Sequence, residues 1–124
     1  MIASRLAALA ALSLISFAPA AAQPAALTVT LQNFSFTPRP IHLKAGRPVT
    51  LTFVNRSGGG HDFTAKSFFA SSRIIAGAAP GGEVELRGGE TRSVTLIPRA
   101  GTYKAHCGHF MHKAFGMTDT IVVS

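Results

Sequence analysis

Residues 49–55 read Val-Thr-Leu-Thr-Phe-Val-Asn, so that apolar side chains alternate with threonines. A period of two is typical of a half-buried β-strand, because successive side chains of a strand point to opposite faces of a sheet. The same alternation recurs in the stretches 27–32, 93–97 and 121–123. All four stretches contain β-branched residues, which favour strands. The sequence therefore predicts an all-β protein.

Turn signals separate the predicted strands. Glycine and proline gather at residues 37–40, 45–48, 57–60, 81–82, 88–89 and 99–101. Short strands with this punctuation, over about a hundred residues, are typical of a Greek-key β-sandwich. One stretch departs from the pattern: residues 65–76 carry apolar residues three to four apart and predict a short helix on the flank of the sandwich. Residues 76–82 predict a loop.

The first 22 residues have the layout of a secretory signal peptide. Arg5 supplies a positive charge, residues 6–18 form an apolar run, and three alanines stand at 20–22. Such a run is short for a stable membrane span, so a retained N-terminal anchor is the less favoured alternative. We expect residues 1–22 to be a signal peptide and residues 23–124 to form a single domain of a periplasmic protein.

A set of metal-binding side chains lies near the C-terminus. Residues 103–117 read Tyr-Lys-Ala-His-Cys-Gly-His-Phe-Met-His-Lys-Ala-Phe-Gly-Met and contain the only cysteine of the chain. Cys107, His112 and Met117 follow one another at intervals of five and offer a thiolate, an imidazole and a thioether. Copper selects this mixture of donors. In an exported protein an unpaired cysteine is unusual, and a bound metal would protect it.

Strand alternation indicates which histidines can join Cys107. Cys107 ends a predicted strand and points inward, whereas His106 points to the opposite face, so we exclude His106 as a ligand of the same ion. A trigonal site needs one more imidazole. His61 is the candidate, because it follows the glycine-rich turn 57–60 that ends a predicted strand. His42 has no such context, and we predict that it lies at the surface.

Together these features resemble a small exported cupredoxin of the plastocyanin and azurin kind, over residues 27–124. The resemblance rests on the strand 49–55 with its glycine-rich turn and His61-Asp62-Phe63, on Gly101-Thr102-Tyr103, and on Cys107-x₄-His112-x₄-Met117 followed by a strand. It implies a cupredoxin-like Greek-key β-sandwich with one type 1 copper ion per chain. It also implies the ligands: His61, Cys107 and His112 as strong ligands, and Met117 as the weak axial one.

Two positions differ from the pattern that this family often shows. Asp62 stands where an asparagine often follows the first histidine ligand. A carboxylate beside the site favours Cu(II) over Cu(I) and lowers the reduction potential. The ligand loop also lacks the proline often found near its histidine, and it carries His109 and Met111 as additional donors.

The expected function is that of an exported one-electron carrier that cycles a type 1 Cu(II)/Cu(I) centre. The edge of His112, between Phe110 and Phe115, is the expected exit for the electron. The alternative is a periplasmic copper chaperone or buffer that delivers Cu(I) to a partner, for which His109 and Met111 would suit ligand exchange. A third interpretation is an accessory β-sandwich without metal. The sequence shows no acid–base carboxylate pair, serine nucleophile pattern or nucleotide loop, so we do not expect an enzyme.

The charge of the chain bears on its partners. Twelve Lys and Arg residues against five Asp and Glu residues give +7, and removal of Arg5 with the signal peptide leaves +6. The basic residues are scattered singly, which argues against nucleic-acid binding. A diffuse positive field suits an acidic redox protein, an acidic copper acceptor protein or an anionic membrane surface, and it also keeps a protein soluble. We expect a monomer.

Overall fold

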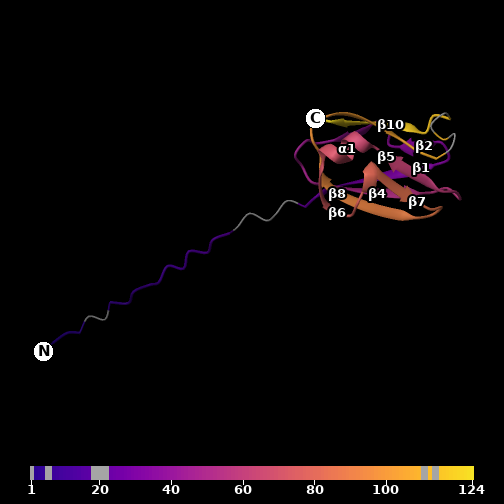
Figure 1. The fold of residues 1–124 in the computed structure, drawn as a ribbon. Helices are drawn as coiled ribbons and strands as arrows, with labels where there is room; N and C mark the ends of the chain where they lie inside the picture. The colour runs from indigo at the N-terminus through magenta and orange to yellow at the C-terminus, as the bar shows by residue number, and fades with distance from the viewer. Residues whose placement is uncertain (1, 5–6, 18–22, 110–111, 113–114) are drawn as a thin grey trace.

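The computed structural model describes residues 2–4, 7–17, 23–109, 112 and 115–124 (Figure 1). Residues 2–4 and 7–17 are exposed and contain no helix or strand. None of the helices in the described ranges is long and apolar enough to cross a membrane. The rest of the described chain forms two five-stranded sheets that face each other, as Figure 1 shows.

The strand order within each sheet brings together segments that are far apart in the sequence. The first sheet consists, in order, of β2 (Ser35–Thr37), β1 (Ala25–Gln32), β4 (Val49–Asn55), β8 (Thr91–Ile97) and β6 (Arg73–Ala76). The second consists of β3 (Ile41–Leu43), β10 (Thr118–Val123), β9 (Gly101–His106), β5 (His61–Thr64) and β7 (Glu83–Leu86). The pairs β1–β4 and β3–β10 are parallel, and the other pairs are antiparallel. The predicted all-β sandwich of two sheets is confirmed.

Aromatic side chains join the two sheets in the core. The ring of Phe63 in β5 lies 4.9 Å from that of Phe53 in β4 and 5.3 Å from that of Phe36 in β2. All three side chains are buried, and complete burial of one such ring stabilises the fold by about 1.5–3 kcal/mol. This packing anchors β5 directly behind His61 and Asp62.

The predicted helix is shorter than residues 65–76. Helix α1 spans Lys66–Ser71, and the next residues form β6, which pairs with β8. The hydroxyls of Ser71 and Ser72 both donate to the carbonyl of Phe68, a local alternative to continuing the helix. The β-branched pair Ile74-Ile75 then favours a strand. The predicted loop 76–82 contains the short 3₁₀ helix η1 (Pro80–Gly82).

The four-residue strands β5 and β7 were not predicted, although the sequence pattern indicated the longer strands. All four residues of β5 are buried, because its outer face is covered as well as its inner face. Its sequence, His-Asp-Phe-Thr, therefore shows no alternation of apolar and polar residues. The position of β5 depends on its partners in the sheet.

Asp119 in β10 is a buried carboxylate that weakens the fold at neutral pH. Its side chain is 2% exposed, and Oδ2 has no hydrogen-bond partner in the described part of the chain. Burial raises the pKa of Asp119 to about 6, and the Thr120 N–H and Arg39 offset only part of this effect. In the unfolded chain the pKa of an aspartate is about 3.9. At pH values between about 3.9 and about 6, the folded state therefore binds more protons than the unfolded state. The stability contributed by the protonated form is therefore lost as pH rises to about 6.

Replacing Asp119 by Asn should raise the free energy of unfolding of the metal-free protein at pH 7 by up to about 3 kcal/mol, because each pKa unit corresponds to about 1.4 kcal/mol. The gain should disappear at pH 4, where the carboxyl is protonated in the folded state. Urea unfolding of both proteins at the two pH values measures this difference. An equal effect at both pH values would show that packing, and not charge, governs the position.

Candidate metal centre

Three ligand atoms meet at one end of the sandwich, from three different segments. His61 begins β5, Cys107 follows β9, and His112 lies in the loop between β9 and β10. The Nδ1 atoms of His61 and His112 are 3.1 Å apart. Cys107 Sγ lies 3.3 Å from Nδ1 of His112 and 3.9 Å from Nδ1 of His61. The two imidazoles and the thiolate thus face a common point.

These distances suit a metal ion. A first-row divalent ion lies about 2.0–2.1 Å from an imidazole nitrogen and about 2.3 Å from a thiolate sulfur. If three such donor atoms surround the ion in a trigonal plane, these bond lengths place the donor atoms about 3.5–3.8 Å from one another. The observed spacings of 3.1, 3.3 and 3.9 Å bracket that range. A trigonal His₂Cys set is the donor set of type 1 copper.

The turn before His61 is fixed by Asn55, at the end of β4. Its Nδ2 group donates to the carbonyls of Gly59, at 2.8 Å, and Arg87, at 3.0 Å. Its Oδ1 accepts from the backbone N–H of Ser57 at 3.0 Å. Asn55 is 1% exposed, so these bonds are shielded from water. These bonds hold the glycine-rich turn in one conformation and so fix the position of His61, which follows it.

Asn33 orients the ring of His61. Nε2 of His61 lies 3.3 Å from Oδ1 of Asn33, in the turn between β1 and β2. When Nε2 donates its proton to this oxygen, the lone pair of Nδ1 faces Cys107 and His112. Burial lowers the pKa of His61, and His112 and His109 lower it further, so the neutral, ligating form is favoured. Sequence reasoning missed Asn33, whose only local signal was an asparagine between two strand patterns.

Cys107 is fully buried and receives a hydrogen bond from the backbone of β5. The N–H of Asp62 donates to Sγ at 3.4 Å. Burial raises the pKa of the Cys107 thiol, and backbone hydrogen bonds from Asp62 and His109 offset only part of this effect. The thiolate is therefore favoured mainly when a cation binds, and metal binding releases the thiol proton.

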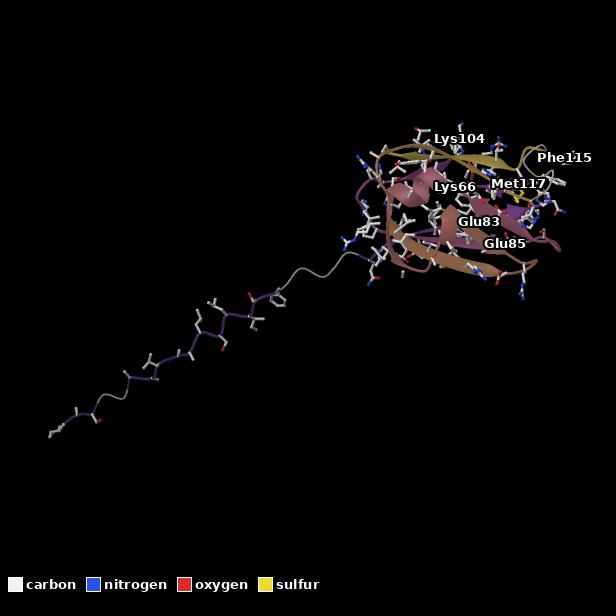
Figure 2. The ribbon with its side chains drawn as sticks, viewed as in Figure 1. Lys66, Glu83, Glu85, Lys104, Phe115 and Met117 are labelled. Carbon is white, nitrogen blue, oxygen red and sulfur yellow. The ribbon has the colours of Figure 1, made fainter. Side chains whose placement is uncertain are left out.

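Met117 is held beside the two ligands of its loop. The N–H of Cys107 donates to the carbonyl of Met117 at 3.1 Å, and the N–H of Met117 donates to the carbonyl of His112 at 3.0 Å. The Met117 side chain is fully buried. Figure 2 shows Met117 just inside the end of the sandwich where Phe115 lies.

The structure separates the remaining histidines from this centre. His106 lies on the other face of the strand from Cys107, as the alternation predicts, and its partner in the sheet is Thr118 of β10. His42 is exposed in β3. His109 stacks on His112, with ring centroids 5.4 Å apart and an interplanar angle of 19°, but its Nε2 is 2.8 Å from Oε1 of Glu85. Phe110 and Met111 lie outside the described residues.

Asp62 ties β5 to the ligand loop. Its side chain is 3% exposed. Oδ1 accepts from the N–H of Gly108 at 2.8 Å and from the hydroxyl of Thr64 at 2.7 Å. Because the N–H of the same residue contacts the sulfur of Cys107, a full negative charge lies close to the thiolate.

The Asp62→Asn variant should have a higher reduction potential. The amide oxygen can keep both hydrogen bonds while the charge that favours Cu(II) is removed. The expected rise is on the order of 100 mV, the scale of a unit charge several ångströms away at an effective dielectric constant of about 20. A redox titration of the visible band measures it. Glu90→Gln, which removes a partly exposed charge paired with Arg92, should shift the potential far less. A lower potential in Asp62→Asn would contradict the electrostatic role.

A thiolate and two imidazoles that converge at one end of a Greek-key sandwich define the class of type 1 copper proteins. The chain belongs to the cupredoxin-like family: residues 5–123 match the family model described as a cupredoxin-like domain. A comparison with curated proteins found no match.

Solved structures share the fold. Dithionite-reduced auracyanin from the photosynthetic bacterium Roseiflexus castenholzii is 18% identical, with 83% of this chain and 99% of that chain covered and a TM-score of 0.62. Auracyanin A, a "blue" copper protein from Chloroflexus aurantiacus, is 20% identical over 82% and 100% of the two chains, with a TM-score of 0.61. A multicopper oxidase from Campylobacter jejuni, described as a metallo-oxidase, is 13% identical with a TM-score of 0.64; the match covers 86% of this chain but only 31% of the oxidase.

Proposed function

We propose that the protein is an exported one-electron carrier, and not an enzyme, with one type 1 copper ion. His61, Cys107 and His112 would hold the ion, with Met117 as a weak axial ligand. The copper would supply the Cu(II)/Cu(I) couple. The observation that carries the proposal is that His112 is only partly buried and packs against the first of two exposed aromatic rings that contact each other.

These rings belong to Phe34 and Phe115. Phe34 meets the ring of His112 edge to face at 5.3 Å and lies 5.1 Å from the ring of Phe115. Phe34 is 42% exposed and Phe115 is 61% exposed. An apolar rim lets a partner approach the ligand ring without stripping water from charged groups. Small, transient contacts of this kind are typical of electron-transfer encounters.

The backbone at Phe34 supports a functional role for this rim. Its φ is 62°, in the left-handed region that a bulky aromatic residue rarely adopts. Such strain persists only where the surrounding structure imposes it, and it gathers at functional sites. Here it lies next to Asn33, so one turn both orients His61 and lays an aromatic ring against His112.

The burial of the ligands favours a carrier over the alternative of a copper chaperone. Cys107 and Met117 are fully buried and His61 is 2% exposed. An acceptor protein would have to reach these atoms to take the ion by ligand exchange. His109 is turned toward Glu85. Ligands fixed in advance instead reduce the rearrangement that accompanies each change of oxidation state. Transfer of Cu(I) to an external chelator should accordingly be slow, and rapid transfer would favour the chaperone.

Export and partner choice complete the proposal. Cleavage after residue 22 would leave Gln23 as the first residue, and the mass of the mature periplasmic protein tests this.

The net positive charge suits an acidic redox protein or an anionic membrane surface. Electron transfer to such a partner should slow as the salt concentration rises, because salt screens the attraction.

The Phe115→Asp variant should slow electron self-exchange by about tenfold or more, because a charge in the rim adds repulsion and a desolvation cost between two copies. Its visible spectrum should not change, since Phe115 donates no ligand atom. Nuclear magnetic resonance line widths of mixed oxidised and reduced protein give the rate. Ile75→Asp, a matched change at a side chain that is 54% exposed in the edge strand β6, should exchange at the unmodified rate. Equal rates in the two variants would place the electron exit elsewhere.

A further inference from the structure

A second group of donor atoms lies beside the copper ligands, on the outer face of the second sheet. Asp62 of β5 and Glu85 of β7 are direct partners in the antiparallel register, so both side chains leave the same face. His109, from the ligand loop, lies over them. Its Nε2 is 2.8 Å from Oε1 of Glu85 and 3.6 Å from Oδ2 of Asp62. The three donor atoms all lie within 4.8 Å of one another.

This place concentrates negative charge in a basic protein. Of the five acidic residues of the chain, three are in β5 and β7: Asp62, Glu83 and Glu85. Figure 2 labels Glu83 and Glu85, which lie two residues apart on β7 and therefore on the same face of the sheet. Carboxylates directly opposite each other in a sheet repel. Burial raises the pKa of Glu83, and Asp62 and Glu85 raise it further. A bound cation would relieve this repulsion.

The buried carboxylate of Asp62 has one oxygen available for a ligand. Oδ1 accepts the hydrogen bonds from Thr64 and Gly108. Among the described residues, the one polar contact of Oδ2 is Nε2 of His109, at 3.6 Å, which is beyond hydrogen-bond distance. The Asp62 side chain is 3% exposed. Oδ2 therefore accepts no hydrogen bond from the described residues and is available to a ligand.

His109 is positioned so that its Nε2 faces the two carboxylates. Its ring stacks on His112. On the other side it lies close to Gly60, where a Cβ would come within 3.1 Å of Cε1 of His109. The absence of a side chain at Gly60 thus leaves room for the ring. Two independent contacts therefore fix the third donor.

We propose that Asp62 Oδ2, Glu85 Oε1 and His109 Nε2 bind one divalent metal ion, in a site separate from the thiolate site. Two carboxylate oxygens and an imidazole without sulfur suit Zn(II) or Cu(II) and disfavour Cu(I). Three protein ligands leave at least one position for water. The proposal requires the first site to be filled with copper, but it does not depend on electron transfer.

The second ion should change the reduction potential of the copper in the thiolate site. It adds positive charge beside Asp62, whose backbone contacts the sulfur of Cys107, and so favours Cu(I) over Cu(II) and raises the reduction potential. Linkage makes the effect reciprocal, since reduced protein must bind the second ion more tightly by the same factor. Tenfold tighter binding corresponds to a rise of about 59 mV for one electron.

Calorimetric titration of the copper-loaded protein with Zn²⁺ tests the site. One further equivalent should bind while the blue band persists, and Glu85→Gln should weaken this binding at least tenfold. Glu90→Gln, which removes one carboxylate outside the group, should bind as the unmodified protein does. Zn²⁺ should also raise the reduction potential of the unmodified protein but not that of Glu85→Gln.

Three results would overturn the proposal. These are no Zn²⁺ binding at millimolar concentration, equal binding by Glu85→Gln and the unmodified protein, and loss of the blue band through displacement of copper. A failure of the first site is recognised separately, because the blue band is then missing before Zn²⁺ is added.

Discussion

The Cys107→Ser variant is expected to lose the intense visible absorption of the copper-loaded protein altogether. This absorption arises from charge transfer from a thiolate to Cu(II), and Cys107 is the only cysteine of the chain. Serine also binds copper far less well, because its hydroxyl is a poor donor for a soft site. The measurement is the visible spectrum together with the copper-to-protein ratio.

The fold should survive this change. Serine is close to cysteine in size, and its oxygen can accept the N–H of Asp62 that now reaches Sγ. The expected loss of stability is about 1–3 kcal/mol, as for a hydroxyl placed in a buried position. Ala105→Ser is the matched control, since Ala105 is also buried in the preceding strand. It should retain the full blue band. An undiminished band in Cys107→Ser would rule out a thiolate-based type 1 site.

The His112→Gly variant should lose the blue spectrum and regain it when imidazole is added. His112 is only partly buried, beside the exposed ring of Phe34, so a small molecule can enter the vacated position. His61→Gly should lose the spectrum equally but recover poorly, because His61 is 2% exposed. Removal of one strong ligand should lower copper affinity at least tenfold, because even loss of a hydrogen-bond partner of a ligand costs 10–100-fold. Titration with imidazole at fixed copper, followed in the visible range, measures both effects.

His106→Ala is the control for both variants. His106 lies next to Cys107 in the sequence but leaves the opposite face of β9. Its replacement should not change the spectrum or the copper affinity. Bleaching in this variant would mean that the face assignment is wrong and that the loop carries the ligands in another order.

The strands and the metal ligands could be predicted from the sequence where residues close together in the chain carry the signal. Alternation of apolar residues with threonine in 49–55 shows a strand, because the period of side chains along a strand is a local property. Cys107, His112 and Met117 lie within one short loop, so their spacing alone pointed to copper. His61 was found through the turn that precedes it. The sandwich and the convergence of the three imidazole and thiolate donors agree with these expectations.

Only the tertiary structure decided which distant residues support these donors. Asn33 and Phe34 reach the centre because β1 pairs with β4, and Glu85 faces Asp62 because β7 pairs with β5. Strand pairing is set by packing between segments far apart in the chain, and no local period records it. The sequence by itself determined the donor atoms and the fold class of this protein, because both can be recognised from local patterns. Their orientation, their aromatic rim and the second group of donors follow from the register of its sheets.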